Sequence, residues 1–192
     1  MLDLRLATPD AWLDAVFADF DGFLLDHAAC ERKAFSTGVS LISSYPKERA
    51  LVTAMLDFAR EELEHFQRLH AILVSRGLDL APHEPDHYAR ALGSKIRRDG
   101  KEKLCDRLLV SGIIEARSCE RLKLMADALE TRDPELAPTY AELARAEARH
   151  HGLFFRLCRD QVGQTAAAAR AAELLDFEAE LVRSLPLRAR VH

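Results

Sequence analysis

The 192-residue chain lacks several features that would assign it to a special class of protein. Its longest apolar stretches, such as Leu108 to Ile114, are too short to span a bilayer, and its acidic start has no basic region leading into a signal-peptide core. Cysteine is scarce. Cys30, Cys105, Cys119 and Cys158 form no Cys-x-x-Cys pair, so we expect reduced thiols packed inside helices. These absences predict a cytoplasmic protein with no membrane contact.

Excess charge and strand-forming patterns are also missing. The formal net charge is -4 and the pI is near 6.1, so only a local basic patch could attract an anionic partner. No segment shows the alternation of a strand, whereas 48% of the residues are hydrophobic and 30% are charged. This composition predicts one compact helical domain over residues 1–192, with a sizeable core.

Proline, glycine and capping residues divide the chain into predicted helices. A short helix follows Thr8-Pro9, and the segment 78–100, which contains Pro82, Pro85 and Gly93, is predicted to be a long connection with one short helix from Asp86. The remaining predicted helices lie at about 22–44, 46–76, 101–130, 133–163 and 165–184. Four long helices with a long crossover after the second are typical of a ferritin-like four-helix bundle, with short helices at both ends.

Two Glu-x-x-His sequences, Glu62/His65 and Glu147/His150, each follow another glutamate at nearly the same distance. Glu31 and Glu62 are 31 residues apart, and Glu115 and Glu147 are 32 residues apart. Two antiparallel helices joined by a short loop would bring each pair to one level. The six candidate metal ligands, through which any catalysis would run, are Glu31, Glu62, His65, Glu115, Glu147 and His150.

Each of the four glutamates lies near the middle of an otherwise apolar helix stripe. Burying an ionised carboxylate without a partner costs roughly several kcal/mol, and Lys and Arg do not occupy these inner positions. A metal is the simplest countercharge. Glu120 is an alternative to Glu115, because Cys30-Glu31-Arg32 recurs as Cys119-Glu120-Arg121, but it is only 27 residues from Glu147 and lies about 140° around the helix from Glu115.

Four carboxylates and two imidazoles form an oxygen-rich set that favours iron or manganese, and we expect two iron ions with open positions for dioxygen. By analogy with other dimetal bundles, Glu62 and Glu147 would bridge the ions. Glu31 and His65 would complete one site, and Glu115 and His150 the other. Three further histidines are expected to be hydrogen-bonded surface or boundary residues rather than ligands: His27, His70 and His151.

Four segments are specific enough to indicate a family. They are residues 26–34 (DHAACERKA), 61–66 (EELEHF), 114–121 (IEARSCER) and 144–155, which include Glu147-Ala148-Arg149-His150. Together they resemble the bacterial tRNA 2-methylthio-N6-isopentenyladenosine hydroxylase family, over about Trp12 to Leu157. The resemblance implies an oxygen-dependent di-iron monooxygenase that hydroxylates a terminal carbon of the isopentenyl group on an adenosine beside the anticodon. An external electron donor, such as a partner reductase, would then be required.

A tRNA substrate would need a cationic surface and a dry pocket for the isopentenyl group. Phe35, Phe58, Phe66 or Phe154 could line such a pocket. The best candidates for contact with the anticodon stem-loop are five basic residues within nine positions: Lys95, Arg97, Arg98, Lys101 and Lys103. On its own, such a run is more often a solvated helix end.

Two other classes of protein share parts of this pattern. A ferritin-like ferroxidase or iron-binding protein would use the same ligands but would assemble into a large cage, whereas we expect a monomer or dimer. A helical interaction module would bind no metal and would tolerate Glu62→Ala or Glu147→Ala. Buried acids favour the enzyme.

Overall fold

The computed structural model describes residues 4–80, 82 and 85–192. Within them, the chain forms seven helices and no strand, as predicted. Residues 1–3, part of the acidic start, and residues 81, 83 and 84, part of the predicted connection, lie outside the described residues. The helices are α1 (Ala11–Ala18), α2 (Phe20–Ser44), α3 (Arg49–Ser75), α4 (His87–Gly93), α5 (Gly100–Arg132), α6 (Ala137–Val162) and α7 (Gln164–Ser184).

The chain divides into two compact units. The first comprises residues 1–13, 85–187 and 192, and the second comprises residues 14–84 and 188–191. Each unit contains one of the two predicted helix hairpins and one Glu-x-x-His sequence. The organisation of residues 1–192 as a single domain stays a prediction.

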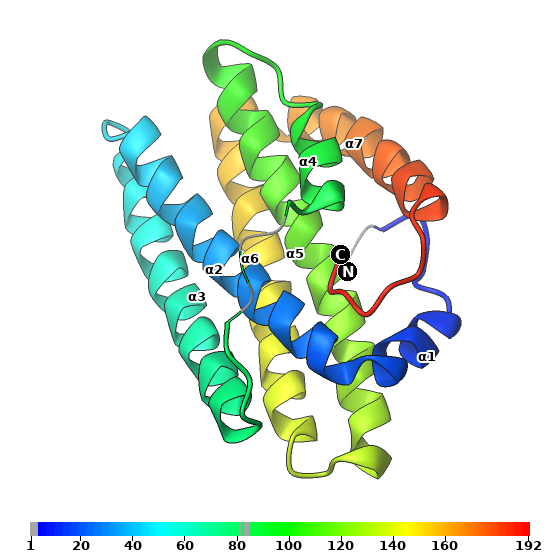
Figure 1. The fold of residues 1–192 in the computed structure, drawn as a ribbon. Coiled ribbons are helices and arrows are strands. Elements are labelled where there is room, and N and C mark those ends of the chain that lie inside the picture. The colour runs from blue at the N-terminus through cyan, green and yellow to red at the C-terminus, as the bar shows by residue number, and fades with distance from the viewer. Residues whose placement is uncertain (1–3, 81, 83–84) are drawn as a thin grey trace. The chain divides into compact units, whose positions relative to one another are not determined.

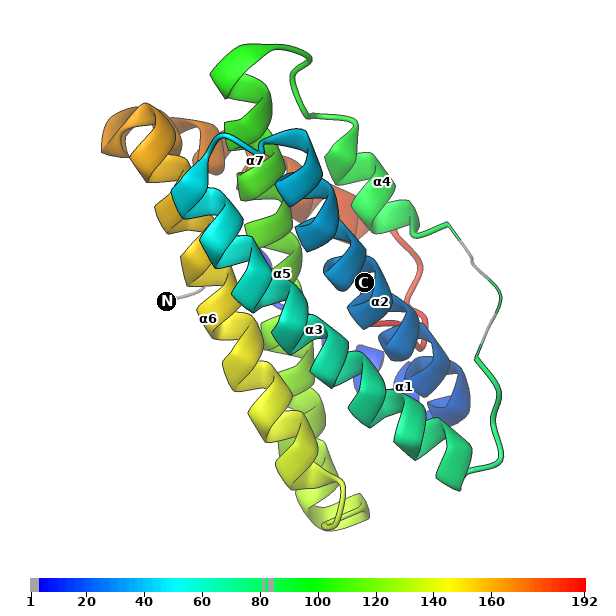
Figure 2. The same cartoon turned by 90° about the vertical axis from the view of Figure 1, so that its left-hand side faces the viewer.

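The second unit is built on the hairpin of α2 and α3, which lie side by side in both ribbon views (Figures 1 and 2). The side chain of Asp19 accepts a hydrogen bond from Gly22 N and so begins α2. Gly77, with φ of 72°, follows the end of α3, where Leu78 N donates to Leu73 O. The hairpin is close at Gly38, because a Cβ there would lie 3.0 Å from the Phe58 ring.

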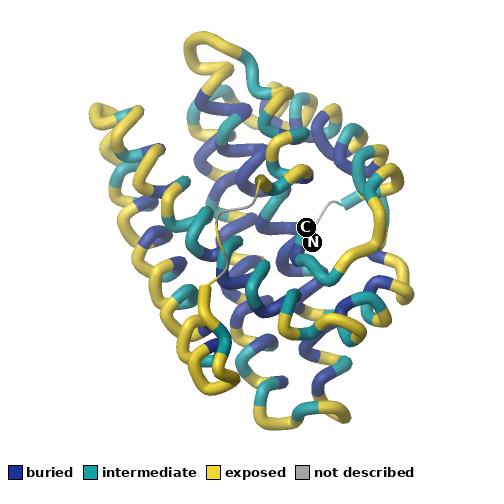
Figure 3. Tube along the Cα trace, viewed as in Figure 1, coloured by how far each residue is buried: buried dark blue, intermediate teal, exposed yellow. Residues whose placement is uncertain are grey.

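The first unit is built on the hairpin of α5 and α6, against which α7 packs; α4 packs against α5 and α7. The middle of α5 is buried almost all round, as Figure 3 shows, which is typical of a central helix. A Cβ on Gly112 of α5 would lie 2.7 Å from the ring of Phe155 on α6. This close approach fixes the register of the two helices.

Cys105 and Cys158 form a disulfide between α5 and α6, with their Cα atoms 5.0 Å apart. The expectation of reduced thiols is therefore wrong for this pair. Both residues are buried, and the register of the hairpin brings them to one level, within the separation that a disulfide spans. Cys30 and Cys119 are thiols, and Cys30 Sγ lies 3.8 Å from Asp26 Oδ2.

Candidate metal centre

In the second unit, α2 and α3 bring together three of the predicted ligands: Glu31, Glu62 and His65. One ligand atom of each lies within 4.8 Å of the others. His65 Nδ1 is 3.4 Å from Glu31 Oε2 and 3.7 Å from Glu62 Oε2, so this nitrogen faces both carboxylates. Both glutamates are buried, and Glu62 is 0% exposed. The predicted spacing of 31 residues thus produces a Glu-Glu-His set within one hairpin.

Glu31 also accepts a hydrogen bond from a residue that the sequence did not assign to the site. His27 Nε2 lies 2.8 Å from Glu31 Oε1, and both side chains are buried. Burial alone would raise the pKa of Glu31, but hydrogen bonds with His27 and His65 outweigh it, so the pKa lies well below its usual range. The set therefore holds an ionised carboxylate inside the protein.

In the first unit, α5 and α6 bring together the other three predicted ligands: Glu115, Glu147 and His150. One ligand atom of each lies within 4.8 Å of the others, and all three side chains are buried. His151, next in the chain, points back to α5, with Nδ1 2.8 Å from the Gly112 carbonyl oxygen. Because a carbonyl only accepts, His151 Nδ1 donates this bond. Gly112 lies about one helix turn before Glu115, so this bond between α6 and α5 supports the register that aligns the three ligands.

The alternative ligand Glu120 lies in a different part of the first unit. Its carboxylate accepts hydrogen bonds from Thr8 N and Thr8 Oγ1, both at 2.8 Å, and pairs with Arg117. Of the three histidines expected at the surface or boundary, only His70 is exposed; His27 and His151 are buried. The sequence signal that could have identified His27 is its position four residues before Glu31, one turn along the same helix face.

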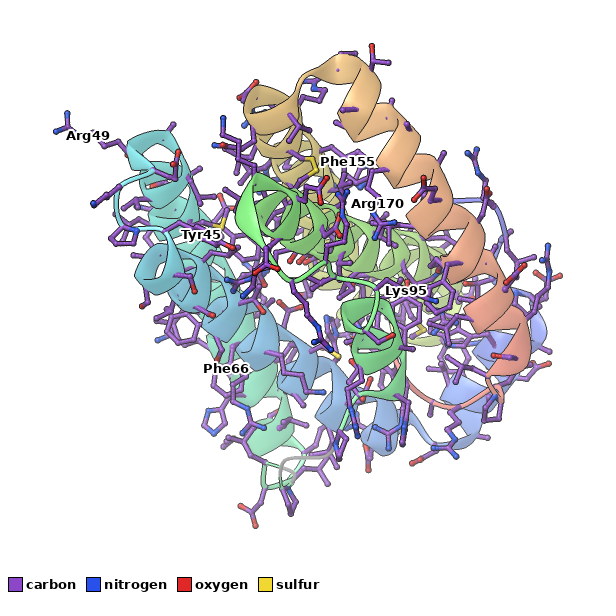
Figure 4. All side chains as sticks on the ribbon, turned by 90° about the horizontal axis from the view of Figure 1, so that it is seen from above. Tyr45, Arg49, Phe66, Lys95, Phe155 and Arg170 are labelled. Carbon is purple, nitrogen blue, oxygen red and sulfur yellow. A yellow bond between two sulfur atoms is a disulfide. The ribbon has the colours of Figure 1, made fainter. Side chains whose placement is uncertain are left out.

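The five predicted tRNA contacts divide into two groups. Lys95 Nζ lies 4.2 Å from the centre of the Phe177 ring, and Arg97 forms a forked ion pair with buried Asp106, at 2.8 and 2.9 Å. Arg170, which is labelled together with Lys95 in Figure 4, donates to Asp106 and to the Lys95 carbonyl oxygen. These contacts position the segment before α5. Lys95 is also exposed, as are the other three residues: Arg98, Lys101 and Lys103.

The donor chemistry of each unit fits iron. Each hairpin supplies two buried carboxylates and one imidazole, which are ligand types that Fe(II) binds well. Besides burial, the side chains that shift the pKa of Glu31 are His27, His65 and Glu62. Two carboxylates close together in a buried set repel each other, and a divalent cation would neutralise this repulsion.

Two helix hairpins that each carry a glutamate and a Glu-x-x-His pair are typical of carboxylate-rich dimetal helix bundles. The chain is a member of the tRNA-(ms[2]io[6]A)-hydroxylase (MiaE) family, whose sequence model matches residues 2–192. This membership confirms the resemblance seen in four segments of the sequence and the prediction of an enzyme.

Individual relatives support the same assignment. The chain is 39% identical over 190 residues to a tRNA 2-(methylsulfanyl)-N(6)-isopentenyladenosine(37) hydroxylase of Pseudomonas putida, covering 98% of this chain and 91% of the relative. It is 31% identical over 147 residues to the Salmonella typhimurium protein of the same name, covering 77% of this chain and 53% of that protein.

A solved structure gives independent support for the fold. It is described as protein 43 with aldehyde deformylating oxygenase activity from Synechococcus, with a TM-score of 0.92 and 35% sequence identity. The match covers 98% of this chain and 94% of that one. The predicted ferritin-like fold class is thereby confirmed.

Within the described residues, no helix has the length and apolar character of a membrane span.

Proposed function

We propose that this protein hydroxylates the isopentenyl group of 2-methylthio-N6-isopentenyladenosine next to the anticodon of tRNA, using two iron ions and dioxygen. The observation that carries the proposal is the pair of Glu-Glu-His sets with buried carboxylates, one in each hairpin of a chain of the MiaE family. In this proposal residues 1–192 act as one ferritin-like domain, in the cytoplasm, where its tRNA substrate is found. Conversion of a C–H bond to C–OH with one O₂ releases water and consumes two electrons and two protons, so a reductase must supply the electrons.

The proposed ligands divide between the two hairpins. Glu31, Glu62 and His65 would hold iron in the second unit, and Glu115, Glu147 and His150 would hold iron in the first unit. Bound iron would activate dioxygen for attack on an unreactive C–H bond. The chain itself supplies four carboxylates that neutralise the cations, and burial that keeps bulk water away from the site.

The isopentenyl group requires apolar surroundings, and the four phenylalanines predicted to line its pocket differ in exposure. Phe58 and Phe154 are buried, whereas Phe35 and Phe66 are partly exposed. We propose that Phe35 and Phe66, both of the second unit, lie at the entrance for the substrate, and that the buried ring of Phe58 in the same unit lies deeper. A phenylalanine with part of its ring in solvent can also stack on a nucleobase.

For the tRNA backbone, we propose contacts through the basic segment from Lys95 to Lys103. Arg98, Lys101 and Lys103 are exposed and would contact phosphates, whereas Arg97 and Lys95 would mainly shape the segment through Asp106 and Phe177. Replacing Lys101 and Lys103 by glutamate should weaken tRNA binding and reduce its salt dependence. Unchanged affinity of this double variant would remove the segment from the proposal.

Nucleoside analysis tests the reaction directly. Cells that make 2-methylthio-N6-isopentenyladenosine but lack the hydroxylase would receive genes for the wild type, Glu147→Ala or the control Glu142→Ala, which changes another glutamate of α6. Mass spectrometry of the tRNA nucleosides should show the hydroxylated nucleoside with the wild type and Glu142→Ala, but not with Glu147→Ala. Absence of conversion by the folded wild type would reject the substrate.

Iron loading and particle size test the alternative of a ferroxidase or iron-binding protein. Anaerobic addition of Fe(II) should load about two ions per chain, as the two ligand sets require. Gel filtration with light scattering should give a monomer or dimer. A cage of many subunits that accumulates iron well beyond two ions per chain would favour the storage function instead.

A further inference from the structure

His27 and Glu31 form a buried pair on one face of α2. His27 lies four residues before Glu31, its Nε2 is 2.8 Å from Glu31 Oε1, and the two side chains are 1% and 5% exposed. The His27 ring is also packed against Phe23, with ring centres 5.9 Å apart. A polar ring held this firmly in the interior has a defined orientation, because both its flat face and its nitrogen have neighbours.

The two oxygens of Glu31 have different neighbours. Oε1 faces His27, whereas Oε2 faces His65 Nδ1 at 3.4 Å. A carboxylate that binds a metal is ionised and can only accept hydrogen bonds, so His27 Nε2 must carry the hydrogen and donate it. One oxygen of Glu31 is therefore held by the protein, and the other points toward the candidate ligands of α3.

We propose that His27 is a positioning residue that holds Glu31 Oε1, so that Glu31 binds its iron through Oε2 alone. This inference rests on the proposed function. A carboxylate bound through one oxygen occupies a single coordination position, which leaves room on that iron for another ligand. Hydrogen bonds of this kind to metal ligands fix their orientation, and their loss typically weakens metal binding by about 10- to 100-fold.

The same arrangement is not repeated in the other hairpin. The residue four positions before Glu115 is Ser111, whose short side chain cannot take the place of an imidazole. The two iron positions would therefore differ, and only the iron bound by Glu31 and His65 should depend on His27. This asymmetry separates a positioning role from a general effect on folding, which would affect both positions.

Ferrous iron binding to the apoprotein tests the proposal. His27→Leu removes the donor, and His27→Gln places an amide N–H near the position of Nε2. His70→Leu replaces an exposed histidine and is the control. Anaerobic titration with Fe(II) should show about 10- to 100-fold weaker binding of one iron in His27→Leu, with the second iron unaffected. His27→Gln should recover most of the affinity, and His70→Leu should match the wild type.

Mössbauer spectra of the ⁵⁷Fe(II)-loaded proteins provide a second measurement that does not depend on activity. His27→Leu should alter the signal of one iron and leave the other unchanged. If His27→Leu does not fold, His27→Asn replaces it, because its shorter amide does not reach Glu31 Oε1. If His27→Leu, or His27→Asn in its place, binds Fe(II) with the affinity of the wild type and gives the same spectra, the inference is overturned. The hydroxylase function would then stay intact. A folded wild type that binds no iron would overturn both.

Discussion

The buried ion pair of Arg117 and Glu178 makes a large and testable contribution to stability. Both side chains are 0% exposed, and Arg117 donates to Glu178 from Nε at 2.9 Å and from Nη2 at 3.1 Å. Tyr88 OH also donates to Glu178, at 2.9 Å, and Arg117 Nη2 reaches the carbonyl oxygen of Leu6. The pair of Arg117 and Glu178 therefore links α5 to α7, to α4 through Tyr88 and to the N-terminal segment through Leu6.

Arg117→Met should leave the Glu178 carboxylate buried without its cation. Breaking a buried pair in this way costs about 3–5 kcal/mol, whereas replacing both partners with apolar residues of similar volume is often close to neutral. We therefore expect Arg117→Met to lower the free energy of unfolding by about 3–5 kcal/mol. At about 2–4 °C per kcal/mol for a chain of this size, the melting temperature should fall by roughly 6–20 °C.

Urea unfolding followed by circular dichroism would measure the two single variants and the double variant Arg117→Met/Glu178→Met. The double variant should be more stable than Arg117→Met, because residue 178 no longer carries a buried charge without its cation, whereas Glu120 loses its pair with Arg117 in both variants. Tyr88 and the Leu6 carbonyl would still lose their partners, at about 1–3 kcal/mol per group. The reasoning would be refuted if Arg117→Met cost less than about 1 kcal/mol, or if the double variant lost at least the sum of the two single effects.

Three further changes probe other contacts of the first unit. Asp106→Asn should cost about 2–3 kcal/mol near neutral pH. Burial would raise the pKa of Asp106, but hydrogen bonds from Arg97 and Arg170 outweigh it and lower the pKa. The stabilisation from ionised Asp106 is therefore present above about pH 4 and is lost as pH falls through the lowered pKa. The difference in free energy of unfolding between Asp106→Asn and the wild type should shrink in acid. A difference that stays constant with pH would contradict this. Gly112→Ala should lower the free energy of unfolding by urea by about 1–3 kcal/mol, because its Cβ would overlap the Phe155 ring. Gly152→Ala is the matched control, since its added Cβ would meet no neighbouring atom within 4 Å. It should raise the free energy of unfolding by about 0.5–1 kcal/mol. Reduction of the disulfide of Cys105 and Cys158, which closes 53 residues, should cost about 4 kcal/mol, and Cys105→Ser should remove the effect of reductant.

Local signals in the sequence predict most of the helices within a few residues. The exceptions are instructive. Pro46 and Pro134 are expected to begin helices, but both lie in turns, and α3 and α6 begin at Arg49 and Ala137. The side chain of Asp133 accepts a hydrogen bond from Leu136 N, which completes a turn before α6 starts. Proline fixes only its own φ, which suits both a first helical turn and a preceding turn, so the sequence alone does not distinguish them.

Contacts between distant residues are less predictable than helix positions. The pairing of Cys105 with Cys158 depends on the register of α5 and α6, which is set partly by the approach of Phe155 to Gly112. Arg97 is predicted as a phosphate contact from its basic neighbours. Its forked pair with Asp106, nine residues along the chain, requires the turn of the backbone before α5, a feature that helix periodicity does not encode.

The criterion that identified the candidate ligands, an acid on an apolar helix face, also applies to residues that bind no metal. Glu178 lies beside Leu174, Leu175 and Ala179 and is as buried as Glu62. Its charge is balanced by Arg117, which the helix pattern of α7 alone could not reveal. Burial raises the pKa of Glu31, and the side chains that lower it are instead two imidazoles and a second carboxyl group. The identity of the partner therefore separates the two roles. A buried acid with its own arginine is electrostatically complete, whereas a set of acids and histidines still requires an external cation.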